Sequence, residues 1–189
     1  MRADVLEGGF AQAPLDSARS FRVAMNALAR PGRIGVLTGA RPPAPLSVAA
    51  GVLLLTLVDG STPVWLAPSH DLPDVRDWLV FHTGAALVAP EAAMFALGRW
   101  EALLPLDRFP LGTPDYPDRS ATLIIECDAL RAEGCRLTGP GIKGEARLSL
   151  PDPAAFAANH ARYPLGFDAF LTAGALVAGL PRSTRVEAI

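Results

Sequence analysis

The end of the chain constrains the fold most, because it is too apolar to be a free tail. Residues 164–187 contain two apolar, strand-like runs, Ala169–Thr172 and Ala175–Leu180, with Ala173-Gly174 at the turn between them. An apolar strand left unpaired at a sheet edge promotes aggregation, so both runs need partners. We therefore expect the final two dozen residues to form a hairpin inside a sheet, with the polar end that follows it presented outward.

That polar end consists of Arg182, Ser183, Thr184 and Arg185. Two guanidinium groups and two hydroxyl groups are suited to bind an anion or the carboxylates of a partner. In a straight strand Arg182 and Arg185 point to opposite faces, so a shared anion site requires a bend at Ser183-Thr184. The alternative is that each arginine forms a local ion pair.

Helical and strand patterns alternate in the first half of the chain, and strands cluster in the second half. Helices are expected from Asp16 or Ser17 to Ala29, from the Ser47 cap to Val58, from Asp71 or Pro73 to Thr83, and from Asp152 or Pro153 to Arg162. Strands are expected at 33–37, 63–66, 85–88, 121–127, 136–138 and 146–150. This order indicates an α/β fold with a mixed sheet and helices on its faces.

Two segments in this pattern have alternative assignments, and two helices have a predicted buried face. The run 47–58 is apolar almost all round, which fits a buried helix or a strand, and 90–100 fits either a strand or a helix. In the first helix we expect Phe21, Met25 and Leu28 to face inward, and in the third Val75, Trp78 and Leu79. The length of 189 residues favours one domain spanning 1–189, with residues 1–14 as an N-terminal arm.

Composition limits the partners and the compartment. Half of the residues are hydrophobic and 19% are charged, so part of the surface is expected to be covered by another subunit. A net charge of −2 without a basic block argues against nucleic-acid binding. The N-terminus lacks the pattern of a signal peptide, and the longest apolar run, Val48–Val58, is too short to span a bilayer. Cys127 and Cys135 do not make a disulfide framework, so we expect a cytoplasmic protein.

The segment 104–119 contains four prolines, which exclude a helix and make the loop stiff. It carries Asp115, Asp118 and Arg119. A carboxylate beside an arginine commonly forms a local ion pair or caps a turn. The alternative is a positioned polar cluster that faces a partner or a ligand.

No complete catalytic pattern emerges. The glycine turn 139–144 lacks the Gly-Lys-Ser/Thr ending of a phosphate loop, and the three histidines, His70, His82 and His160, have no metal-binding spacing. His82 follows an apolar helix face, where it either donates a structural hydrogen bond or points into a cleft. Cys127 ends an apolar strand and is expected to lie in the core. We expect neither a cofactor nor a metal.

Several segments resemble, in the same order, those of the PhnH family of the bacterial carbon–phosphorus lyase system. They are Phe21-Arg22 with Met25, Pro31-Gly32, 54–57, 62–66, 81–83, 111–113, 120–124, 137–142, 164–168, Leu171-Thr172 and 181–187. Each match is weak alone, and the order over nearly the whole chain makes the resemblance specific.

The resemblance implies a fold and a role. The fold would be a three-layer α/β/α sandwich similar to that of pyridoxal-phosphate-dependent transferases but without the cofactor, whose Schiff base needs a lysine. The only lysine here, Lys143, lies in a glycine turn. The role would be that of a homodimer or a complex subunit working with PhnG, PhnI, PhnJ and PhnL.

In that complex PhnG, PhnI and PhnL, with this subunit, would displace adenine from ATP with a phosphonate, giving ribose 1-phosphonate 5-triphosphate. The resemblance brings no catalytic residues that transfer position by position, so we expect a structural or site-completing subunit. The alternative is a stand-alone enzyme or binding protein that holds an anionic ligand with Arg182, Arg185 and His82.

Overall fold

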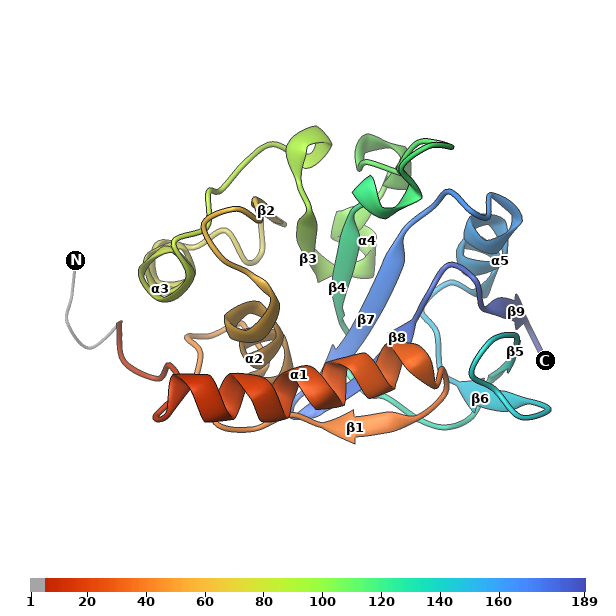
Figure 1. Ribbon diagram of the computed structural model, residues 1–189, viewed down its shortest axis with the longest axis horizontal. Coiled ribbons are helices and arrows are strands. Elements are labelled where there is room, and N and C mark those ends of the chain that lie inside the picture. Colours follow the sequence, from red (N-terminus) through yellow and green to blue (C-terminus); the bar gives the residue numbers. More distant parts are fainter. Residues whose placement is uncertain (1–5) are drawn as a thin grey trace.

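A six-stranded mixed sheet forms the centre of the protein (Figure 1). The computed structural model describes residues 6–189. In spatial order the strands are β1 (Ile34–Val36), β8 (Leu176–Leu180), β7 (Asp168–Ala173), β4 (Thr122–Glu126), β3 (Phe95–Arg99) and β2 (Val64–Leu66). The four strands β2, β3, β4 and β7 are parallel, whereas β8 is antiparallel to both of its neighbours. The fold is therefore α/β with a mixed sheet, as the alternating sequence pattern predicts.

Helices and a second, smaller sheet cover this central sheet. The helices are α1 (Ala13–Ala29), α2 (Val48–Leu57), α3 (Pro73–Thr83), α4 (Trp100–Leu103) and α5 (Pro153–Ala161), with 3-10 turns at Pro90–Ala92, Leu106–Arg108 and Pro117–Arg119. The smaller sheet has the order β6 (Ala146–Leu148), β5 (Cys135–Thr138) and β9 (Arg185–Glu187). Among residues 6–189, no helix is both long enough and apolar enough to cross a membrane.

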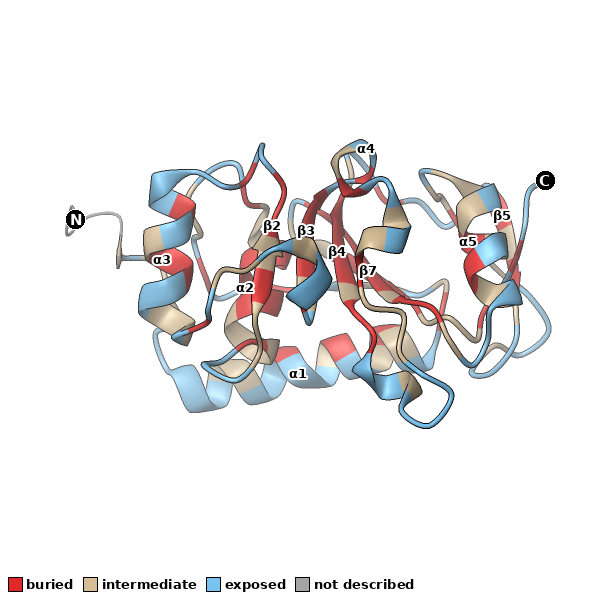
Figure 2. Ribbon diagram, turned by 90° about the horizontal axis from the view of Figure 1, so that it is seen from above, coloured by how far each residue is buried: buried red, intermediate tan, exposed pale blue. Residues whose placement is uncertain are grey.

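The central strands β3, β4 and β7 consist mostly of buried residues (Figure 2), as expected for parallel strands covered on both sides. On β4, Ile124 belongs to one hydrophobic cluster, which includes residues of α1, α2 and α3. Its neighbours Leu123 and Ile125 belong to a second cluster, which includes residues of α4, α5 and the smaller sheet. The period-two alternation of a strand thus divides the core into two parts.

The terminal hairpin is confirmed. Strands β7 and β8 pair in register from Ala169 with Leu180 to Ala173 with Leu176, and the turn places Gly174 at a φ of +58°. This left-handed conformation suits glycine, which has no side-chain clash there. The two strands lie in the interior of the sheet, between β4 and β1.

Other local predictions have mixed outcomes. The run 47–58 is the buried helix α2, capped by the Ser47 hydroxyl, which accepts a hydrogen bond from the N–H of Ala50. The ambiguous stretch 90–100 contains a 3-10 turn and strand β3. The predicted strand 85–88 is wrong, because only Leu87 bridges, to Val64. The predicted arm is shorter than 1–14, because α1 already begins at Ala13; residues 1–5 of that arm lie outside the described residues.

Of the apolar face predicted for α1, only Leu28 packs against the core, where it is half buried, and the prediction is wrong for the other two residues. Phe21 and Met25 are half exposed, and the buried residues of the helix are Ser20, Ala24 and Ala27. The reason is the short distance between α1 and β8. A Cβ atom added to Gly179 of β8 would lie 2.5 Å from the backbone at Ala27. Small residues on both elements are required for such a close approach, so Phe21 and Met25 turn outward.

This contact gives a direct test. We expect Gly179→Ala to lower the free energy of unfolding by about 2 kcal/mol, because the added methyl group clashes with backbone that cannot easily move. Urea denaturation measures the change. Gly60→Ala is the matched control, because its Cβ would meet no atom closer than 3.7 Å, and a change within about 0.5 kcal/mol is expected. Equal effects of the two substitutions would contradict the proposed close packing.

Candidate functional site

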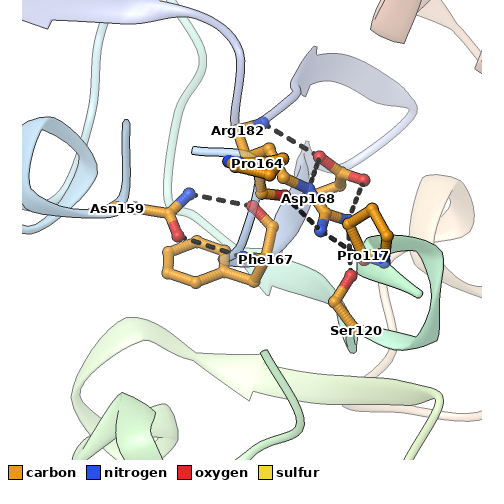
Figure 3. Close-up of polar contacts among 7 residues, drawn as sticks. All are labelled: Pro117, Ser120, Asn159, Pro164, Phe167, Asp168 and Arg182. Carbon is orange, nitrogen blue, oxygen red and sulfur yellow. Dashed lines mark hydrogen bonds and ion pairs between the residues drawn. The ribbon is translucent and has the colours of Figure 1, made fainter. Parts of the chain in front are cut away.

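Arg182 is turned into the protein and not outward, in contrast to the expectation for the polar end. Its side chain is 11% exposed and forms an ion pair with Asp168, at 2.7 Å between Nη2 and Oδ2 (Figure 3). The backbone N–H and Nε of Arg182 also donate to Asp168 Oδ1, at 2.9 and 3.1 Å. Because Asp168 is the first residue of β7, this pair ties the end of the hairpin to its beginning.

The remaining donors of Arg182 reach the stiff loop and the segment before β7. Nη1 donates to the carbonyl oxygens of Pro117, at 2.7 Å, and Pro164, at 3.5 Å, and Nη2 donates to the hydroxyl of Ser120. A guanidinium group has five N–H donors, and all five are used here. An anion shared with Arg185 would therefore have to displace one of these protein acceptors.

A second polar contact lies beside this ion pair. Asn159 of α5 donates from Nδ2 to the carbonyl of Phe167 and accepts from the N–H of the same residue, at 2.8 and 3.0 Å (Figure 3). A buried asparagine with both amide groups satisfied stabilises one arrangement of its neighbours. Together the two contacts use the polar groups at the end of the sheet where β7 begins, so the role of these groups is structural.

The other predicted site residues are dispersed. Asp118 and Arg119 are exposed, and Arg119 stacks on the ring of Tyr116 at 4.0 Å. Arg185 is exposed on β9, Ser183 is half buried, and the hydroxyl of the buried Thr184 has no hydrogen-bond partner among the described residues.

His82 holds the N-terminal segment. Its Nε2 lies 2.9 Å from the carbonyl oxygen of Leu6, and its ring packs between those of Trp78 and Phe81. Gly9 lies against the same ring, because an added Cβ there would be 2.4 Å from it. Of the two roles considered for His82, a structural hydrogen bond or a position in a cleft, these contacts are those of the structural role.

A different group of polar residues lies at the opposite end of the sheet, where the parallel strands end. Two adjoining cavities of about 250 Å³ each lie there and share Arg99, Glu126 and Cys127; we call them the strand-end cleft. Arg99 and Glu126 are the last residues of β3 and β4 and lie side by side in register. In open α/β sheets ligands bind outside the carboxyl ends of the strands, so this cleft is the candidate functional site.

The Glu126 carboxylate is held firmly in this cleft. It is 9% exposed, and it accepts hydrogen bonds from the backbone N–H of Ser47, at 2.8 Å, and from the hydroxyl of Thr172, at 2.9 Å. Ser47 caps α2, so the carboxylate lies at the positive end of that helix. Both interactions favour a negative charge at this position.

His70 lines the same cleft and is 3% exposed. Burial lowers the pKa of its imidazole; the nearby Glu126 opposes this shift and Arg99 adds to it. Its Nδ1 lies 2.9 Å from the Ser69 hydroxyl. His70 therefore favours the neutral form, in which one ring nitrogen donates and the other accepts.

The remaining cleft groups are poorly suited to nucleophilic attack. Burial, with Glu126 and Asp128 nearby, raises the pKa of the Cys127 thiol to about 11, so the thiol is protonated at neutral pH. The sequence had predicted Cys127 in the core; it is half buried, packs against the second hydrophobic cluster and also lines the cleft. Arg99 pairs with Asp128 at 2.5 Å. Within residues 6–189 no three His, Cys, Asp or Glu side chains are grouped so that they could hold a metal ion.

Comparison with known proteins identifies the family. Residues 8–187 match the family described as bacterial phosphonate metabolism protein (PhnH). The chain is 42% identical, over 98% of both sequences, to the alpha-D-ribose 1-methylphosphonate 5-triphosphate synthase subunit PhnH of Rhizobium meliloti (strain 1021). The chain belongs to the PhnH family. A putative C-P lyase subunit protein, HtxG, of Stutzerimonas stutzeri is 34% identical over 96% of both sequences.

Family membership confirms the resemblance found in the sequence and a role in bacterial phosphonate metabolism. The two relatives are both named as subunits, so the PhnH chain is best understood beside partner proteins. Its strand-end cleft was missed because His70, Glu126 and Thr172 are far apart in the sequence and form no motif. The sequence signal that could have revealed the cleft was that Arg99, Glu126 and Thr172 lie near the carboxyl ends of three strands, which are parallel in the structure.

The ion pair of Arg182 generates one prediction. Arg182→Met leaves the Asp168 carboxylate without its partner in a largely buried position, so we expect the free energy of unfolding to fall by about 3 kcal/mol. Arg131→Met is the control, because Arg131 and Glu133 form an exposed pair, and a loss below about 1 kcal/mol is expected. Urea denaturation compares the two. If Arg182→Met costs no more than the control, the ion pair does not hold the hairpin.

His70 generates a second prediction. Because its pKa is lowered in the folded state, the unfolded chain takes up a proton first as the pH falls through about 6.5. This contribution is absent above that pH and lowers the free energy of unfolding below it, by up to about 1.4 kcal/mol per pH unit. His70→Asn should have a shallower decline between pH 7 and 5, as measured by urea denaturation at each pH. Identical slopes in the two proteins would rule out His70 as the source.

Proposed function

We propose that this chain is a subunit of the bacterial carbon–phosphorus lyase system. Together with PhnG, PhnI and PhnL it supports the displacement of adenine from ATP by an alkylphosphonate, which gives ribose 1-phosphonate 5-triphosphate. The observation that carries this proposal is the 42% identity over 98% of both chains to a named subunit of the corresponding synthase. PhnJ is a further expected partner, and the expected compartment is the cytoplasm.

The geometry of the cleft supports a structural or site-completing role for the isolated chain. The Cys127 thiol is protonated at neutral pH, and both oxygens of Glu126 already accept hydrogen bonds. Arg99 is paired with Asp128. In this displacement the phosphonate itself is the attacking group, so the protein has to position it and the departing adenine, and these three side chains are already engaged within the chain or, for Cys127, protonated. We infer that the chemistry requires residues of partner subunits.

The surface supports assembly with other chains. Phe21, Met25 and Val36 are between 51% and 58% exposed, as is Phe81 at the end of α3. Exposed apolar side chains of this size are typical of protein interfaces when they lie together. Asp118, Arg119 and Arg185 are exposed polar residues that remain candidates for partner contacts. Without its partners the chain is expected to form a homodimer.

The finer description of the fold belongs to the same proposal. A three-layer α/β/α arrangement, similar to pyridoxal-phosphate-dependent transferases without the cofactor, is supported by core clusters on both faces of the central sheet. The only lysine, Lys143, lies in the turn between β5 and β6.

A second candidate function is a stand-alone enzyme or binding protein for a phosphate or phosphonate ligand. The strand-end cleft favours it, because a cavity at the carboxyl ends of parallel strands is a common ligand site. The charge of this cleft does not favour an anion, since Glu101, Glu126 and Asp128 line it, with Arg99 as the single arginine among residues 6–189.

One assay separates the two functions. The purified chain incubated with ATP and methylphosphonate should release no adenine above the background, because Arg99 and Glu126 of the described cleft are already engaged within the chain. The same chain purified with PhnG, PhnI and PhnL should release adenine, detected by liquid chromatography. The matched control is the partner mixture without this chain, which should be less active. Adenine release by the isolated chain would overturn the subunit role in favour of a stand-alone enzyme.

A further inference from the structure

A groove of about 480 Å³ between α1 and β1 is lined by four arginines, Arg19, Arg22, Arg30 and Arg33. No aspartate or glutamate among residues 6–189 lines it. Among residues 6–189, Arg22, Arg30 and Arg33 form no ion pair, and Arg19 approaches only Asp16, at 3.8 Å. Elsewhere in the described chain six of eleven arginines pair with carboxylates: Arg76, Arg99, Arg131, Arg136, Arg147 and Arg182. We call this feature the arginine groove.

The arginine groove is long and narrow. Arg19, Arg22, Asn26 and Arg30 recur at spacings that place them on one side of α1, as a row along the helix. Arg30, the residue after the end of α1, comes eleven positions after Arg19, so at 1.5 Å per residue the row extends over about 16 Å. An extended chain of about five residues covers the same length, since a strand rises about 3.3 Å per residue. A single compact anion would contact only part of this row.

The other wall of the groove is the edge strand β1, which runs beside α1 (Figure 1). β1 is the terminal strand of the six-stranded sheet, so its outer edge has no strand partner in the part of the chain that is described. An unpaired edge offers backbone donors and acceptors to an added strand. The groove also has apolar surface from Val23 of α1 and from Ile34 and Val36 of β1, the last 58% exposed.

These three features fit one kind of occupant. An extended acidic peptide with alternating apolar residues offers all three kinds of contact. Its backbone can bond to the strand edge, its carboxylates can pair with the arginines, and its apolar side chains can pack on Val36. Such strand addition is a common mode of peptide recognition. Arginine also pairs with carboxylates through two parallel hydrogen bonds, which fixes the register of the bound segment.

We propose that the arginine groove binds an acidic, extended segment of a partner subunit, which adds a strand to the open edge of β1. This inference rests on the subunit role proposed above and names one surface through which the chain enters its complex. Binding is driven in part by charge, so it weakens as salt concentration rises.

Assembly measurements test this docking surface. The tagged chain is co-expressed with PhnG, PhnI and PhnJ, and the amount of co-purified partner is compared between the wild type and an Arg22→Glu/Arg30→Glu variant. We expect the variant to retain about a tenth of the partner or less, because both reversed charges repel the acidic segment. The matched control is Arg131→Glu/Arg147→Glu, which reverses the same charge at exposed positions outside the groove and should retain the partners. Thermal unfolding of each variant confirms that it folds.

The outcomes separate this inference from the proposed function. If the wild type assembles and the Arg22→Glu/Arg30→Glu variant assembles equally well, the docking inference is wrong and the subunit role stands. If the wild type does not assemble, the subunit role fails, and the inference fails with it. If the variant loses calorimetric binding of tripolyphosphate while assembly is unchanged, the groove is an oligophosphate site and the docking inference is overturned.

The occupant can be identified by photo-crosslinking. A benzoylphenylalanine placed at the exposed position of Val36 should capture an acidic peptide of a partner subunit, read by mass spectrometry of the co-purified complex. Capture of a peptide from a second copy of this chain would instead show that the groove is a self-association surface, and would overturn the assignment to a partner.

Discussion

The central strands of this protein are completed by the last segment of the chain, and one ion pair fixes that segment. Strand β7 lies between β4 and β8, and β8 lies between β7 and β1. Arg182, just after β8, bonds to Asp168 at the start of β7 and to Pro117 and Ser120 of the stiff loop. A charged group this far from solvent is tolerated only when its donors are satisfied, which ties the three segments to one arrangement.

The two ends of the parallel strands therefore differ: polar groups at one end are bonded within the protein, and those at the other end line a cleft. Where the parallel strands begin, Arg182 and Asn159 use their polar groups internally. Where those strands end, Glu126 is anchored by Ser47 and Thr172 beside an open cleft. Strand direction therefore separates groups that hold the fold from groups that are positioned to meet a ligand or a partner residue.

Local sequence patterns predicted those features that depend on local interactions. The Ser47 cap, the inward residues Val75, Trp78 and Leu79 of α3, and the terminal hairpin follow from spacing, capping and turn chemistry. The inward face of α1 does not, because it is set by the contact between Ala27 and Gly179, which are distant in sequence.

The polar groups were harder to predict for the same physical reason. The partners of Arg182 come from the stiff loop and from β7, and no local pattern connects them. The strand-end cleft depends on which strands are parallel and where each ends. A sequence without motif spacing therefore reveals its hydrophobic framework more readily than its binding surface.

The distribution of arginine carries more information than its number. The chain has 17 lysines and arginines, of which Lys143 is the only lysine, and 19 acidic residues give it a net charge of −2. A compositional bias toward arginine would place arginines at random relative to carboxylates. Within residues 6–189, six of the eleven arginines outside the groove have carboxylate partners, whereas inside the groove only Arg19 approaches one, Asp16, at 3.8 Å. In a chain with an excess of acid, that local excess of positive charge needs a reason in the assembled protein. A partner's carboxylates supply one that composition alone does not.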